Sequence, residues 1–77
     1  MPHIIVKMLA GRSDSQKKML ADEITKVVMK QTGNTEDAVS VSIIDIKQSD
    51  WTENVYKPDI AANWDKLYKK PGYNPLA

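Results

Sequence analysis

The sequence predicts an α/β (α+β) fold in which a βαβ unit is followed by a C-terminal helix, in a single domain over residues 1–77. Two segments rich in β-branched residues flank one segment with helical periodicity. A chain of 77 residues buries only a modest share of its surface, and this one has no cysteine and one histidine. Because disulfides and a structural metal are then not expected, we expect dimerisation to complete the sheet.

The first strand is predicted at residues 3–9, HIIVKML, where β-branched side chains are frequent. Alternation along a strand places apolar side chains on both of its faces: Ile4, Val6 and Met8 on one, Ile5 and Leu9 on the other. Such a strand needs two coverings. One is the protein's own helix, and we expect another subunit to provide the second.

A helix of about 19 residues is predicted next, beginning at Ser13 and ending near Gly33. Ser13 and Gln16 have capping-box spacing. One face is apolar, with Leu20, Ile24, Val27 and Val28. A second, parallel strand follows at residues 39–47, VSVSIIDIK.

A second helix is predicted after Ser49, with Pro58 in its first turn. Apolar residues recur at helical spacing, and a Pro-Gly pair ends the run: Ile60, Trp64, Leu67 and Tyr68, then Pro71 and Gly72. The last five residues, YNPLA, are expected to form a poorly tied tail.

Composition excludes several classes of protein. With 11 basic and 10 acidic side chains, the chain lacks the concentrated basic face of a nucleic-acid binder. Its apolar stretches are too short for a signal peptide or a membrane span, so we expect a cytoplasmic protein. It has no Ser/His/Asp set, phosphate-binding glycine loop or cluster of metal ligands. We therefore expect no cofactor and no metal.

Met1-Pro2 is the unusual feature, because removal of Met1 would expose a secondary amine at the start of a core strand. Burial and a nearby cation both lower the pKa of such an amine, which favours a role as a base. Arg12, beyond Gly11 in the turn after the strand, is the candidate cation. Proline at position 2 is nevertheless common and does not by itself indicate catalysis.

Three features together resemble the 4-oxalocrotonate tautomerase family over residues 2–51. They are the start PHIIV, the turn GRSDSQK at 11–17, and an aromatic residue at Trp51 after the second strand. The stretch KKPGY at 69–73 resembles the longer PptA-type bacterial members. This resemblance implies a cofactor-independent isomerase that acts on a small-molecule 2-oxo acid or enol acid. It also implies a homodimer, with the hexamer of the shorter members as the alternative.

The resemblance also implies a role for each site residue. Pro2 would take a proton from an enol hydroxyl or from a carbon next to a carbonyl and return it to another carbon. Arg12 would bind a carboxylate or the developing enolate oxygen, and Trp51 would form a wall of the pocket. Ser40 stands where the best-known members have a second arginine that holds a second carboxylate. Serine cannot form such a charged clamp, so we expect a monoacid such as phenylenolpyruvate.

The sequence also allows other interpretations of two residues and of the function. Glu53 could activate water, as a carboxylate does in hydrating relatives, although a carboxylate at a helix start is the simpler interpretation. His3 is interpreted as a strand residue. The chain could also be a non-catalytic oligomeric binding module on the same scaffold. A retained Met1 would favour that module, because the nitrogen of Pro2 would then be an amide without basicity.

Overall fold

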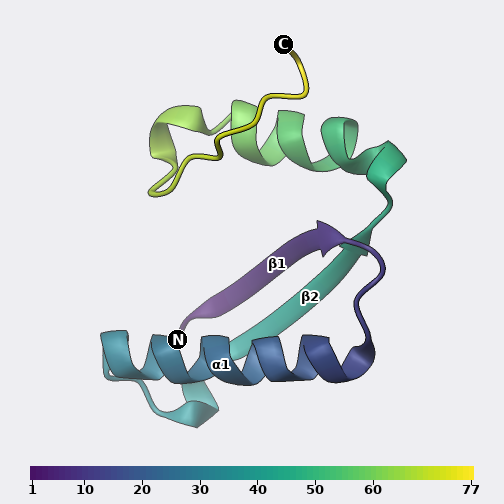
Figure 1. Ribbon diagram of the computed structural model, residues 1–77. Coiled ribbons are helices and arrows are strands. Elements are labelled where there is room, and N and C mark those ends of the chain that lie inside the picture. The colour runs from purple at the N-terminus through teal and green to yellow at the C-terminus, as the bar shows by residue number, and fades with distance from the viewer. The chain divides into compact units, whose positions relative to one another are not determined.

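The computed structural model describes residues 1–77 and divides into two compact units, Met1–Asp45 and Ile46–Ala77. Strand β1 (His3–Leu9), helix α1 (Asp14–Thr32) and strand β2 (Ser40–Ile46) follow one another, and β2 ends at the boundary of the first unit. The strands are hydrogen-bonded neighbours, and their arrows point the same way in Figure 1. The predicted βαβ unit is confirmed.

Capping at both ends fixes the length of α1. The Gln16 backbone N–H donates to the Ser13 hydroxyl at 3.2 Å, and the Ser13 backbone N–H donates to the Gln16 side-chain oxygen at 3.3 Å. At the other end, Gly33 has a φ of 74° and donates its N–H to the Met29 carbonyl at 2.9 Å. A left-handed residue after the last turn favours glycine, so the helix ends where the sequence predicts. A short 3₁₀ turn, η1 (Glu36–Ala38), precedes β2.

Helix α1 covers one face of the strand pair. Lys17 forms an ion pair with Asp45 of β2 at 2.6 Å, and Leu20 lines a pocket together with Met8 of β1. The predicted place of Val27 on this face is wrong, because its side chain is 57% exposed. The covered stripe instead follows the i, i+4 rows that begin at Lys17 and Leu20, and Val27 lies at its edge.

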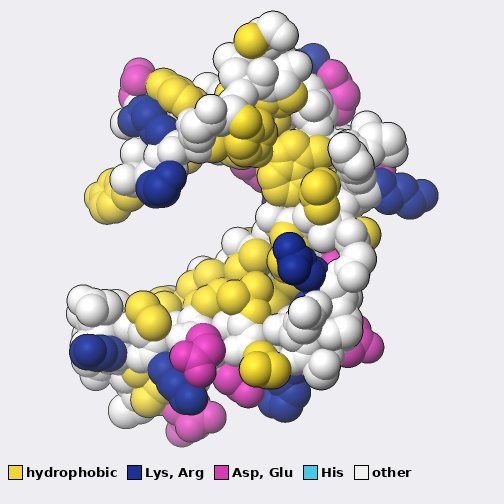
Figure 2. All heavy atoms as spheres, in the orientation of Figure 1, with side chains coloured by type: hydrophobic (Ala, Val, Ile, Leu, Met, Phe, Trp, Pro, Cys, Tyr) yellow, Lys and Arg dark blue, Asp and Glu magenta, His cyan; other side chains and the backbone are white.

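The opposite face of the strand pair is not covered by α1. Side chains alternate along each strand, so every second residue of β1 and of β2 points away from the helix. Ile5, Leu9 and Ile44 belong to this set and are 55%, 44% and 40% exposed. Figure 2 shows apolar side chains gathered over the strands on the side away from α1. Both faces of the pair therefore carry apolar side chains, as the sequence predicts.

The second unit differs from its predicted structure. A 3₁₀ turn, η2 (Gln48–Asp50), leads into a π-type helix, η3 (Thr52–Ala61), and a 3₁₀ turn, η4 (Trp64–Lys66), follows. The helix thus begins and ends earlier than expected, and Pro58 lies inside it. The predicted helix through residues 60–68, with Pro58 in its first turn, is wrong.

Pro58 and Asn63 explain this difference. Proline has no N–H to donate and disturbs the ordinary i to i−4 ladder, and here the helix has the wider π pattern. Its last backbone bond runs from the Ala62 N–H to the Lys57 carbonyl at 3.0 Å. The Asn63 side-chain amide then donates to the carbonyls of Pro58 and Asp59, at 3.3 and 3.2 Å. These bonds satisfy carbonyls at the helix end, so the helix stops before Trp64.

Aromatic contacts hold the chain beyond the helix. Val55 and Tyr56 of η3 are buried, at 4% and 3% exposure. The ring of Tyr73 lies 5.6 Å from that of Tyr56, centroid to centroid, and its hydroxyl accepts the Trp51 indole N–H at 2.9 Å. The start of the expected loose tail is therefore tied down at Tyr73.

No helix in the structure combines the length and the apolarity needed to cross a membrane. The expectation of one domain over residues 1–77 stays a prediction.

Candidate active site

Pro2 lies immediately before β1 and is half-buried. Its carbonyl oxygen accepts the backbone N–H of Ser40 at 3.2 Å, which pairs the start of β1 with the start of β2. With Met1 attached, the nitrogen of Pro2 is an amide. Without Met1, the same nitrogen would be a secondary amine at the start of a paired strand.

Arg12 is exposed and lies in the turn between β1 and α1. Gly11 before it has a φ of 126°, a conformation that residues with a Cβ rarely adopt, and no atom lies within 4 Å of the place where a Cβ would stand. The backbone torsion, not crowding, therefore explains the glycine. Ser13 after it is the helix N-cap. Arg12 is thus held between a glycine turn and a capped helix.

An open pocket adjoins Arg12. Its walls combine two cationic side chains, one amide and two apolar side chains: Arg12, Lys17, Gln16, Met8 and Leu20. Such a wall fits an organic anion, with the apolar groups on its carbon skeleton and a cation on its charge.

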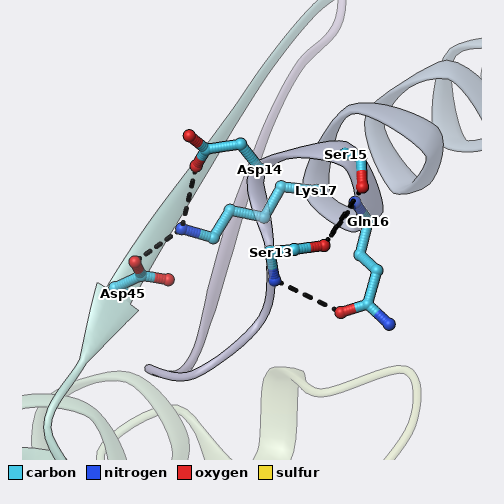
Figure 3. Close-up of polar contacts among 6 residues, drawn as sticks. All are labelled: Ser13, Asp14, Ser15, Gln16, Lys17 and Asp45. Atoms are coloured by element: carbon cyan, nitrogen blue, oxygen red, sulfur yellow. Dashed lines mark hydrogen bonds and ion pairs between the residues drawn. The ribbon is translucent and has the colours of Figure 1, made fainter.

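The two cations of this pocket differ in their partners. Lys17 lies 2.6 Å from Asp45 and 3.9 Å from Asp14, as Figure 3 shows. The hydrogen bond to Asp45 raises the pKa of Lys17 above its ordinary value, against the effect of desolvation, and the charges of Asp45 and Asp14 add to the rise. Lys17 is therefore engaged with two carboxylates, whereas Arg12 forms no ion pair in the structure. Arg12 is the cation that a ligand could use.

Pro2 comes directly before β1 and Arg12 comes shortly after its other end. The strand has 7 residues between them, and at about 3.3 Å per residue it separates them by roughly 20 Å. The joint action of Pro2 and Arg12 in one site stays a prediction, and the length of β1 between them favours a site to which two chains contribute.

Ser40 and His3 form a pair next to Pro2. The Ser40 hydroxyl oxygen lies 2.7 Å from Nδ1 of His3, within hydrogen-bond distance. Both side chains have the parity that points away from α1. The sequence predicts Ser40 as a substrate-binding residue and His3 as an ordinary strand residue. It does not predict the contact between them.

Trp51 is half-buried directly before η3, in the second unit. Its indole N–H donates to the Tyr73 hydroxyl, so in this structure it is not free to donate to a ligand. Glu53, in the first turn of η3, accepts from Lys57 at 2.6 Å. A helix-start carboxylate in an i, i+4 ion pair is the simpler of the two readings of Glu53.

No group of three or more His, Cys, Asp or Glu side chains is arranged to hold a metal ion. Comparison with known proteins bears on the chemistry of the site. The family described as "Tautomerase enzyme" matches residues 2–54.

The chain belongs to the tautomerase family.

This tautomerase is 46% identical to a probable tautomerase of Xylella fastidiosa over 77 residues, which cover 100% of the chain and 94% of that protein. It is 40% identical to tautomerase PptA of Cronobacter sakazakii over 95% of the chain and 97% of that protein. Among solved structures, SAR1376, a putative 4-oxalocrotonate tautomerase from Staphylococcus aureus, is similar with a TM-score of 0.58 and 46% identity, over 60% of this chain and 74% of that one. The resemblance read from the sequence is confirmed. The protein is an isomerase, which decides against the non-catalytic module.

Proposed function

We propose that this tautomerase converts the enol form of a 2-oxo acid, such as phenylenolpyruvate, into the keto form, with the amine of Pro2 as general base. The amine accepts the proton of the enol hydroxyl, which leaves an enolate, and the resulting ammonium returns a proton to the neighbouring carbon. The observation that supports this role most is the place of Pro2, half-buried at the start of a paired strand.

Arg12 is proposed to bind the carboxylate of the substrate or the developing enolate oxygen. A fixed cation stabilises a developing anion better than water does, because it needs no reorganisation during the reaction. Its pocket also offers apolar groups for the carbon skeleton. Trp51 is proposed as an aromatic contact for the substrate. Ser40, without charge, favours acids with one carboxylate.

The separation of Pro2 from Arg12 along β1 supports an active site that is shared between two chains. We infer a homodimer in which two βαβ units form a four-stranded sheet. A two-fold axis that reverses the strand direction would bring the start of one β1 close to the end of its partner's β1. The sheet of one chain has only two strands, so each strand has an unpaired outer edge at which a second chain can add its strands.

The N-terminus provides the direct test of Pro2. Chains that begin at Pro2, as verified by mass spectrometry, should isomerise phenylenolpyruvate, and kcat/KM should rise with pH as the amine loses its proton. Chains with an uncleaved extension before Pro2 should be inactive, because an amide nitrogen is not basic. Pro2→Ala, with a primary amine at the same place, should keep part of the activity. Full activity in chains shown to retain Met1 would end the assignment of Pro2.

A further inference from the structure

Ser40 contacts Pro2, which precedes β1, and His3, the first residue of β1. Its backbone N–H donates to the Pro2 carbonyl at 3.2 Å, and its hydroxyl lies 2.7 Å from Nδ1 of His3. One residue of β2 thus contacts both the carbonyl of Pro2 and the side chain of His3. The first contact is part of the strand pairing, whereas the second is made by side chains alone.

This double contact bears on the amine of Pro2. In a mature chain no residue precedes Pro2, and its nitrogen belongs to a rigid ring, so the ring turns relative to the strand mainly about the bond from Cα to the carbonyl carbon. Ser40 holds that carbonyl and the residue after it. The axis about which the amine turns is therefore fixed by β2.

We propose that His3 and Ser40 form a positioning pair for the Pro2 amine, a proposal that rests on Pro2 as the base. Proton transfer needs the base within about 2.6–3.2 Å of the proton's heavy atom, and a misplacement of about 1 Å can cost up to 10²-fold in rate. Neither side chain has to touch the substrate for this effect. Both act through the peptide of Pro2.

The chemistry of the pair suits a role in positioning. Neutral histidine can accept the serine O–H at Nδ1 or donate an Nδ1–H to the serine oxygen, and charged histidine can also donate. The contact therefore does not depend on which of the two side chains donates the hydrogen. A positioning pair should accordingly change the rate without displacing the ascending limb of the pH profile.

Five variants of the mature enzyme test the pair. Ser40→Ala and His3→Ala should each lower kcat for phenylenolpyruvate by about 3- to 10-fold and leave KM within about twofold, because the amine is misplaced and not removed. Ser40→Thr keeps the hydroxyl and His3→Asn keeps a polar group near the position of Nδ1, so both should restore kcat to within about twofold of the parent. Ser42→Ala, on the same strand face two residues further along, is the matched control and should match the parent.

The double variant His3→Ala/Ser40→Ala decides whether the two residues act together. If they form one device, the double variant loses no more kcat than either single variant. Three results would overturn the positioning pair. The first is a loss of kcat in the double variant equal to the product of the two single losses. The others are an unchanged kcat in both alanine variants and an ascending limb of the pH profile that moves to another pH. The same series includes chains blocked before Pro2, and activity in those chains would refute Pro2 as the base instead. Circular dichroism of each variant excludes unfolding as the cause.

Discussion

At the residue scale, Arg12 and Lys17 show how two cations in one pocket can have different uses. Lys17 is engaged by Asp45 and Asp14, and its raised pKa records that engagement. Arg12 is exposed and forms no ion pair, so its charge is available to an anion. Its planar fork also matches a carboxylate better than an ammonium does. These differences support the proposal that Arg12 binds the charge of the substrate.

Arg12→Ala should lower kcat/KM for an enol acid by about 10²-fold, because one charge-assisted contact to a developing anion is lost. The melting temperature should change little, since Arg12 is exposed. Steady-state kinetics and a thermal melt measure the two effects. Lys18→Ala, which removes an exposed cation of α1 outside the pocket, is the control and should leave kcat/KM unchanged. Equal kinetics for Arg12→Ala and the parent would remove Arg12 from the site.

At the element scale, the ion pair between Lys17 and Asp45 connects the first turn of α1 to the end of β2. The capping box of Ser13 and Gln16 adjoins this connection, as Figure 3 shows. Together these contacts hold the helix start that follows Arg12. The position of Arg12 thus depends on the packing of α1 against the strands.

The raised pKa of Lys17 predicts a pH dependence of stability. The folded state holds this proton more tightly than the unfolded state, so the stabilisation is complete below the ordinary lysine pKa of about 10.4 and is lost as pH rises through the folded pKa. In urea titrations above that pH, the free energy of unfolding should fall more steeply in the parent than in Lys17→Gln. Lys18→Gln is the control, because it removes an exposed ion pair with Asp22 at 3.6 Å. Its free energy of unfolding should fall with pH as steeply as that of the parent. Equal slopes in the parent and Lys17→Gln would contradict the assignment.

At the scale of the whole molecule, the length of β1 argues for shared active sites. A strand of 7 residues separates Pro2 from Arg12, and the turn after it holds Arg12 at the far end. The unpaired edges of the two-stranded sheet are independent support for a partner. Two chains related by a two-fold axis would form two equivalent sites.

Shared sites predict complementation between two defective variants. Chains blocked before Pro2 lack the base, and Arg12→Ala chains lack the cation. In a mixed dimer one site receives the intact Pro2 of one chain and the intact Arg12 of the other. Random mixing after unfolding and refolding together should therefore restore about one quarter of the parent activity. Sedimentation equilibrium should show two chains, and a stable monomer, or no gain of activity on mixing, would contradict the shared site.

Local signals predicted the first unit well and the second poorly. Ser13, Gln16 and Gly33 act on their own helix, so the ends of α1 could be read from the sequence. The second helix depends on how Asn63 bonds the carbonyls before it, and apolar spacing through Trp64 carries no sign of that contact.

The same distinction holds for the candidate site. Pro2, Arg12, Ser40 and Trp51 are predicted site residues that the family resemblance suggested. The pairing of Ser40 with His3 joins residues 37 positions apart, and that of Trp51 with Tyr73 joins residues 22 apart. Contacts of this kind arise from the fold. No local pattern in the sequence predicts these contacts.

Met1 is fully exposed, and the contact that anchors Pro2 is made by its carbonyl, on the side away from Met1. The βαβ unit therefore gains nothing from Met1 and should fold equally well with or without it. If Pro2 is the base, a preparation can be pure, folded and thermally stable and yet consist of inactive precursor. Turnover per chain then measures how completely the N-terminus was processed, and a fusion tag at that end would silence the enzyme without unfolding it.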